Sequence, residues 1–186
     1  MISCIIWDLG ETITTPPPGG TDYKPLDQYN NIELRPNVVK TLKKIESLGL
    51  KNVILSNTAS SDSATVIRML DRLGVLEMFE YVYATQSELD PDIPQKPDEI
   101  VFNKVLQKIG VKPKDCIMVG NTWDTDIVGA NRAGMHAVWL QNPLVSVRKN
   151  CEVTVNTPPW ILPVWDVDSV PKAIELIIES KNHFAD

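Results

Sequence analysis

The chain has little cysteine, little histidine and no long hydrophobic run. Its 186 residues include three cysteines and two histidines, with no spacing typical of a metal site. An odd number of cysteines without a disulfide framework favours a reducing compartment. No apolar run approaches the ~20 residues of a membrane span, and the amino terminus does not resemble a signal peptide. We therefore expect a cytoplasmic protein without a membrane partner.

An excess of positive charge is also absent. The 18 Lys and Arg residues are outnumbered by 24 Asp and Glu residues, which gives a formal net charge of −6. This balance disfavours nucleic acid as a partner. No G-x-G-x-x-G segment follows the first apolar run, so a dinucleotide-binding site is not expected.

Apolar runs and amphipathic segments alternate along the chain. Strands are predicted at 3–8, 51–56, 81–84, 115–120, 137–140 and 161–164. Helices are predicted at 37–48, 63–73, 99–109, 124–133 and 170–179. Alternating strands and helices with right-handed crossovers form a parallel sheet with helices on both faces. The length suits a single α/β domain over residues 1–186.

Polar residues follow three of the predicted strands. Asp8 follows the first, Ser56 ends the second, and the polar segment 121–126 follows the fourth. Open α/β sheets bind ligands at the carboxyl ends of their strands, and a carboxylate there can act as a nucleophile. The plain alternative is that Asp8 and Ser56 form ordinary strand-end turns. Similarly, Lys96 could neutralise a bound anion, although a lone lysine is usually solvated.

In order and type, these segments resemble the motifs of the haloacid dehalogenase superfamily, most of whose members are phosphatases. The four motifs fall on Asp8, Ser56, Lys96 and the segment 121–126, and the resemblance covers nearly the whole chain. It implies a three-layer Rossmann-like fold with a parallel sheet of five or six strands in the core order 3-2-1-4-5. It also implies that strands one and four lie side by side.

The resemblance further implies roles for individual residues and a Mg²⁺ cofactor. Asp8 would be the nucleophile that forms an aspartyl-phosphate. The residues expected to bind the substrate phosphate are Ser56, Asn57, Lys96 and Thr12. The expected metal ligands are Asp8, the Gly10 carbonyl and Asn121, with Asp126 behind them.

Two acids of the family pattern are missing. Gly10 stands where family phosphatases carry the acid that protonates the leaving group, a contribution of about 10²–10⁴-fold in rate. Asn121 stands where a carboxylate usually binds the metal, and an amide oxygen is a weaker ligand for a hard cation. The neighbouring Glu11 could replace the missing acid, or it could turn to solvent or bond the loop backbone.

Two irregular stretches remain. The segment 14–36 exceeds the usual length of a βα loop and is expected to form a flap over the site or a disordered excursion. It is too short for a large cap domain, and capless relatives often act on bulky substrates. The stretch 142–163 could contact a substrate or a second subunit, so a homo-oligomer is one option.

These observations together predict a Mg²⁺-dependent phosphatase acting on a small-molecule phosphate monoester. Gly10 leaves two alternatives open. One is a hydrolase of phosphonates or of another bond besides P–O. The other is a catalytically impaired module that binds a phosphorylated ligand.

Overall fold

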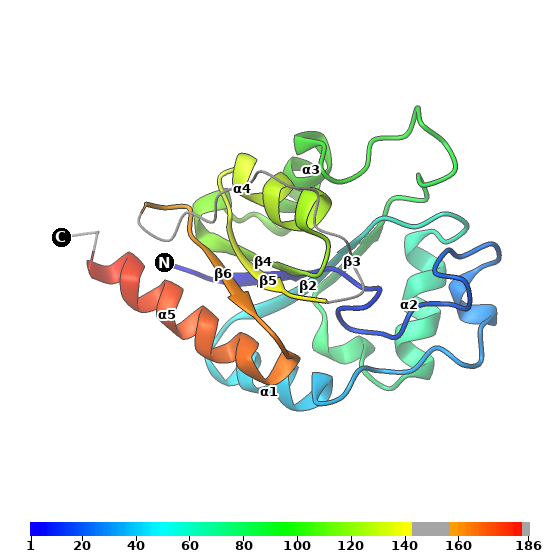
Figure 1. Ribbon diagram of the computed structural model, residues 1–186, viewed down its shortest axis with the longest axis horizontal. Coiled ribbons are helices and arrows are strands. Elements are labelled where there is room, and N and C mark those ends of the chain that lie inside the picture. The colour runs from blue at the N-terminus through cyan, green and yellow to red at the C-terminus, as the bar shows by residue number, and fades with distance from the viewer. Residues whose placement is uncertain (143–156, 184–186) are drawn as a thin grey trace.

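The computed structural model describes residues 1–142 and 157–183, which form a six-stranded parallel sheet in the order β3-β2-β1-β4-β5-β6 (Figure 1). This order confirms the predicted one and adds β6 at the edge beyond β5. The strands are β1 (Cys4–Trp7), β2 (Lys51–Ser56), β3 (Tyr81–Ala84), β4 (Cys116–Gly120), β5 (His136–Leu140) and β6 (Ile161–Val164). The helices are α1 (Val38–Ser47), α2 (Ser63–Arg72), α3 (Glu99–Ile109), α4 (Gly129–Arg132) and α5 (Val170–His183).

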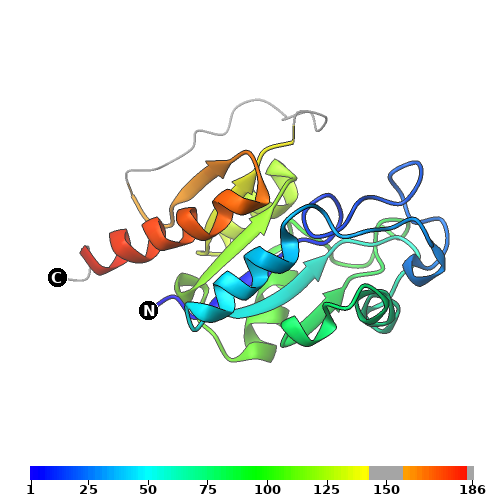
Figure 2. The same ribbon diagram turned by 90° about the horizontal axis from the view of Figure 1, so that it is seen from below.

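Helices cover both faces of the sheet, as predicted. Residues of β1 alternate between two hydrophobic clusters, because successive side chains of a strand point to opposite faces. Ile5 and Trp7 pack in the cluster that holds α1, α2 and α5, whereas Cys4 and Ile6 pack in the cluster that holds α3 and α4. Figure 2 shows α1 and α5 side by side across one face. None of the helices in the described ranges is both long and apolar enough to span a membrane.

Local sequence signals explain most helix boundaries. The side chain of Asp62 accepts a hydrogen bond from Thr65 N–H and caps α2. Asp98 caps α3 in the same way through Ile100 N–H, and Gly110 ends that helix in the left-handed conformation. Such caps satisfy backbone groups that the helix itself leaves unpaired.

The predicted helix over 124–133 has a different form. The structure has a wide π-helical turn at Trp123–Val128, followed by the short α4. The turn brings Asp126 back to the end of β4, where its carboxylate accepts a hydrogen bond from Thr122 N–H at 2.9 Å. The other Asp126 oxygen accepts from the Lys96 ammonium, 30 residues away, so the turn lies between a local and a distant contact of one carboxylate.

The segment 14–36, here called the flap, packs against the rest of the chain. Leu26, Tyr29 and Ile32 are buried in the cluster that contains α2. The flap carries one short 3-10 turn, Leu26–Gln28, and no large cap domain is seen in the described residues. Of the second irregular stretch, residues 143–156 lie outside the part that the structure describes.

Candidate active site

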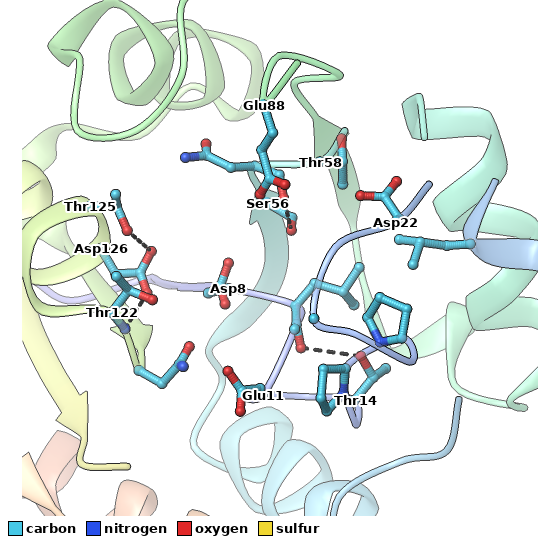
Figure 3. Close-up of a pocket in the computed structure, with 18 of the residues that line it drawn as sticks. Asp8, Glu11, Thr14, Asp22, Ser56, Thr58, Glu88, Thr122, Thr125 and Asp126 are labelled. Carbon is cyan, nitrogen blue, oxygen red and sulfur yellow. Dashed lines mark hydrogen bonds between the residues drawn. The ribbon is translucent and has the colours of Figure 1, made fainter. Parts of the chain in front are cut away.

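The carboxyl ends of β1, β2 and β4 surround one cavity of about 270 Å³. The register places Trp7 beside Ile54 of β2 and Val119 of β4, so the residues after these positions meet at one edge of the sheet. Figure 3 shows Asp8 between Asp126 and Ser56, with Glu88 and Glu11 on opposite sides. Most of the predicted site residues line this cavity: Asp8, Gly10, Glu11, Ser56, Asn57, Lys96, Asn121 and Asp126.

A buried group of three charges lies at the base of the cavity. The Lys96 ammonium donates to Asp8 Oδ1 at 2.8 Å and to Asp126 Oδ1 at 2.7 Å. Lys96 is 2% exposed, Asp126 1% and Asp8 8%. This Lys96 is therefore a buried, paired cation rather than a solvated surface lysine. Two carboxylates share one ammonium, so the group carries a formal charge of −1 when all three residues are ionised.

Burial determines how these groups titrate. Desolvation raises the pKa of Asp8 from 3.8 to about 6, with Lys96 opposing the shift and Asp126 adding to it. Desolvation also disfavours the charged form of Lys96, but Asp126 and Asp8 outweigh it and raise the pKa of the ammonium. The lysine therefore stays protonated at neutral pH, while the Asp8 carboxylate is held in an unfavourable environment.

Asn57 and Pro97 hold Lys96 in position. The Asn57 side chain donates to the Lys96 carbonyl and accepts from its N–H, both at 2.9 Å. On the other side, Gly129 packs so closely that an added Cβ would lie 2.9 Å from Pro97 Cα. The amide of Asn57, predicted to bind phosphate, is thus engaged with backbone, and its observed contacts position Lys96.

Thr12, predicted to bind phosphate, is fully buried and is not among the residues that line the cavity, so its role toward phosphate stays a prediction. Its hydroxyl lies 3.4 Å from Asp8 Oδ2 and 3.1 Å from Asn121 Oδ1. Thr12 therefore links Asp8, which follows β1, to Asn121, which follows β4, without lining the cavity itself.

Asp8 Oδ2 and Asn121 Oδ1 both lie within hydrogen-bond distance of the Thr12 hydroxyl, and Lys96 bonds the other Asp8 oxygen. Both are oxygen donors suited to a hard cation such as Mg²⁺. Within residues 1–142 and 157–183, no three His, Cys, Asp or Glu side chains gather into a metal site. A metal here would use amide and backbone carbonyl oxygens as well as Asp8, and the donor set that the resemblance implies stays a prediction.

Gly10 and Glu11 occupy the place of the missing acid. Gly10 does not have a left-handed backbone, and an added Cβ would find no atom within 4 Å. Glu11 has φ 57°, its carbonyl accepts from Arg35, and its carboxylate accepts from Asn142 Nδ2 at 3.1 Å. The structure therefore has free space at position 10 and a partner for the Glu11 carboxylate.

Two acids at the cavity were missed by the sequence analysis. Asp22 lies in the flap and Glu88 in the loop after β3, and neither follows a motif. Burial, followed by the charge of Asp22, raises the pKa of Glu88. An acidic residue in a long loop gives no local signal, because its position depends on contacts with distant segments.

The comparisons with known proteins identify the family. The model of haloacid dehalogenase-like hydrolases matches residues 19–134. A glyceraldehyde 3-phosphate phosphatase from Methanothermobacter thermautotrophicus is 30% identical over 127 residues, which cover 66% of this chain and 53% of the relative. A protein of the same name from Methanopyrus kandleri is 34% identical, with 57% of this chain and 42% of the relative covered. The chain thus spans about half the length of these curated relatives or less.

Solved structures agree. A crystal structure of an uncharacterized protein from Listeria monocytogenes serotype 4b is 43% identical and superposes with a TM-score of 0.90, covering 96% of this chain and 99% of that one. A haloacid dehalogenase-like family hydrolase from Xanthomonas campestris is 11% identical with a TM-score of 0.73, covering 98% of each chain, and supports the fold alone.

The buried charges predict an unusual effect on stability. Asp8→Asn should increase the free energy of unfolding by about 1–3 kcal/mol near neutral pH, because it removes a buried charge and leaves Lys96 paired with Asp126. The pKa of about 6 in the folded protein exceeds the ordinary 3.8, so the gain should be complete above pH 6 and vanish toward pH 4. Urea denaturation with EDTA measures it.

Asp126→Asn should have the opposite effect. Its two oxygens accept from Lys96 and from Thr122 N–H, which can only donate, so an amide nitrogen would face a donor and cost about 1–3 kcal/mol. Asp71→Asn, on the exposed side of α2, is the control and should change stability by less than about 0.5 kcal/mol. Equal losses for Asp8→Asn and Asp126→Asn would contradict this account.

Proposed function

Since the chain belongs to the haloacid dehalogenase-like hydrolases, we propose that it is a phosphatase that cleaves a phosphate monoester through an aspartyl-phosphate on Asp8. The observation that carries the proposal is the Asp8–Lys96 pair at the base of the cavity. A carboxylate nucleophile and a buried ammonium within one enclosure suit attack on a dianionic phosphoryl group. Curated relatives named glyceraldehyde 3-phosphate phosphatase support a small phosphorylated substrate.

Asp8, Lys96 and Ser56 have different roles in the proposed reaction. An Asp8 oxygen attacks phosphorus, the ester P–O bond breaks, and the leaving oxygen takes a proton from water, since Gly10 carries no acid. Lys96 stabilises the charge on the transferring group, and the Ser56 hydroxyl, which donates to the Asn57 carbonyl at 3.1 Å, would turn its hydrogen bond to that group. Attack of water on the phospho-aspartate then releases inorganic phosphate and restores the Asp8 carboxylate.

Mg²⁺ fits the oxygen donors that face the cavity. Asp8, the Gly10 carbonyl and Asn121 would hold it, and when bound it would offset the negative charge of the phosphoryl group. Asp126 would stay behind these ligands, because its carboxylate is engaged by Lys96 and Thr122. A cytoplasmic location remains a prediction from the composition.

The nucleophile is tested by Asp8→Asn. This variant should have no measurable turnover and should no longer be labelled by beryllium fluoride, because its amide cannot form the acyl-phosphate. Release of phosphate from a panel of monoesters with Mg²⁺ is the measurement, and Asp71→Asn is the matched control. Undiminished turnover in the Asp8 variant would remove this mechanism.

The metal site is tested by Asn121→Asp. An anionic oxygen beside Asp8 should tighten Mg²⁺ binding by about tenfold, since ligand charge sets the affinity for hard cations. Isothermal titration calorimetry measures this without turnover. Asn103→Asp adds the same charge on the exposed face of α3 and should leave binding unchanged. Weaker or equal binding in a folded Asn121→Asp protein would argue against the site.

The missing acid is tested by Gly10→Asp. The open space around Gly10 accommodates the new side chain, and turnover of ordinary monoesters should rise by about 10²-fold, the usual acid–base contribution. Because Asn142 engages Glu11, the companion Glu11→Gln should lower the wild-type rate by less than about tenfold. Both rates come from steady-state phosphate release.

The outcomes distinguish the remaining functions. Loss of most activity in Glu11→Gln, with rescue by Gly10→Asp, would assign proton transfer to Glu11. No gain in a folded Gly10→Asp protein on any monoester would point to another bond, such as that of a phosphonate, or to binding alone. Assays of phosphate and phosphonate esters in parallel separate these two cases.

A further inference from the structure

A buried carboxylate fastens the flap to the loop between β2 and α2. Asp22 is 5% exposed. Its Oδ1 accepts from Ala59 N–H, and its Oδ2 accepts from Ser60 N–H and the Ser61 hydroxyl, all at 2.8 Å. In Figure 3, Asp22 lies on the flap side of the cavity, facing the segment that carries Thr58. Three donors meet one carboxylate, so the contact is specific for Asp.

Further contacts extend this attachment. The Ser61 hydroxyl, which is fully buried, also accepts from Leu26 N–H at 2.9 Å. Farther along α2, Arg72 donates to the Tyr29 carbonyl at 2.9 Å. The flap is thus joined to the protein at both ends of α2, and its own apolar side chains are buried between these points. Such a segment behaves as a fixed wall rather than a loose loop.

The wall closes one side of the site. The flap residues that line the cavity are Thr14, Thr15, Pro16, Pro17, Gly20, Asp22 and Leu26. The cavity volume of about 270 Å³ is near the lower limit for ligand pockets and fits a small molecule. A phosphate on a folded protein or a nucleic acid would have to bring a much larger surface past this wall.

Resting on the proposed phosphatase function, we propose that Asp22 is a positioning residue that locks the flap, so that the site accepts small phosphate monoesters and excludes phosphates carried on macromolecules. This reverses the expectation, drawn from the lack of a cap, that the substrate is bulky. The flap takes the place of a cap by restricting access. Asp22 does not touch the reacting atoms, because all its carboxylate bonds go to residues 59–61.

The experiment compares wild type with Asp22→Asn. The new amide nitrogen would face N–H donors, so the flap should detach. Substrates are glycerol 3-phosphate and a phosphoserine decapeptide. Wild type should favour the small ester by about 10²-fold in kcat/KM. The variant should reduce this preference by about tenfold, through a higher KM for the small ester and a gain on the peptide. A variant that is only destabilised would lower kcat/KM for both substrates by the same factor.

One control variant and one alternative variant complete the test. Asp27→Asn breaks the Asp27–Arg68 ion pair between the same flap and α2 but leaves the Asp22 contacts, and it should retain the wild-type preference. If Asp22→Asn does not fold, Ser61→Ala removes two of the same hydrogen bonds and should shift the preference in the same direction. Equal preferences in all folded variants would overturn the proposal.

Two measurements do not depend on turnover. Hydrogen exchange at Ala59 N–H should be slow in wild type and about tenfold faster in Asp22→Asn; fast exchange in wild type would overturn the proposal. Binding of the two phosphate esters to Asp8→Asn protein, measured by calorimetry with Mg²⁺, should show the same preference for the small ester. If wild type hydrolyses neither ester but the binding preference is present, the phosphatase function is rejected and the role of the flap is kept.

Discussion

The Lys96 ammonium, buried between Asp8 and Asp126, is the interaction on which the site depends. It lies on neither β1 nor β4, yet it joins the residues that follow these two strands. A buried cation must be paired, because desolvation of an isolated charge is expensive. The fold therefore has to bring three distant segments together at one point. The wide turn at 123–128 and the Asn57 contact with the Lys96 backbone are both consequences of that demand.

Close packing gives the ion group its precision. An added Cβ at Gly120 would lie 2.4 Å from Asp126 Oδ2, so only glycine lets this carboxylate fold back onto the strand end. Gly129 allows the segment after the turn to approach Pro97. The same glycines that weaken a helix by propensity are needed here for contact distance. A larger residue at Gly120 would displace the Asp126 carboxylate, and one at Gly129 would displace Pro97 and the neighbouring Lys96. Either substitution would therefore move a charged group rather than only disturb apolar packing.

The sequence was sufficient for the elements and their order, and less so for the flap and the turn. Periodicity predicted β2 and α3 with their observed limits, because each is set by local hydrophobic pattern and by capping residues such as Asp98. The strand order followed from the family resemblance. The π-helical turn and the position of the Asp22 side chain were not predictable. Each depends on a hydrogen bond between segments 30 or more residues apart. The contact of Thr12 with Asn121 was not predictable for the same reason, since the two residues are 109 positions apart.

The chain has Gly10 and Asn121 in place of the two acids of the family pattern, but it has the three charges that are difficult to bury. Replacing a buried ion group by apolar residues of similar volume is often neutral or stabilising, so stability alone would not retain Asp8, Lys96 and Asp126. Their arrangement is useful only if a further charged group enters the cavity and exploits it. The proposed phosphoryl substrate would meet this condition, because the ammonium could turn part of its hydrogen bonding from Asp8 to the incoming oxygens. Glu88 also lines this cavity, while the Asp22 carboxylate is engaged with residues 59–61 and holds the flap that forms one wall.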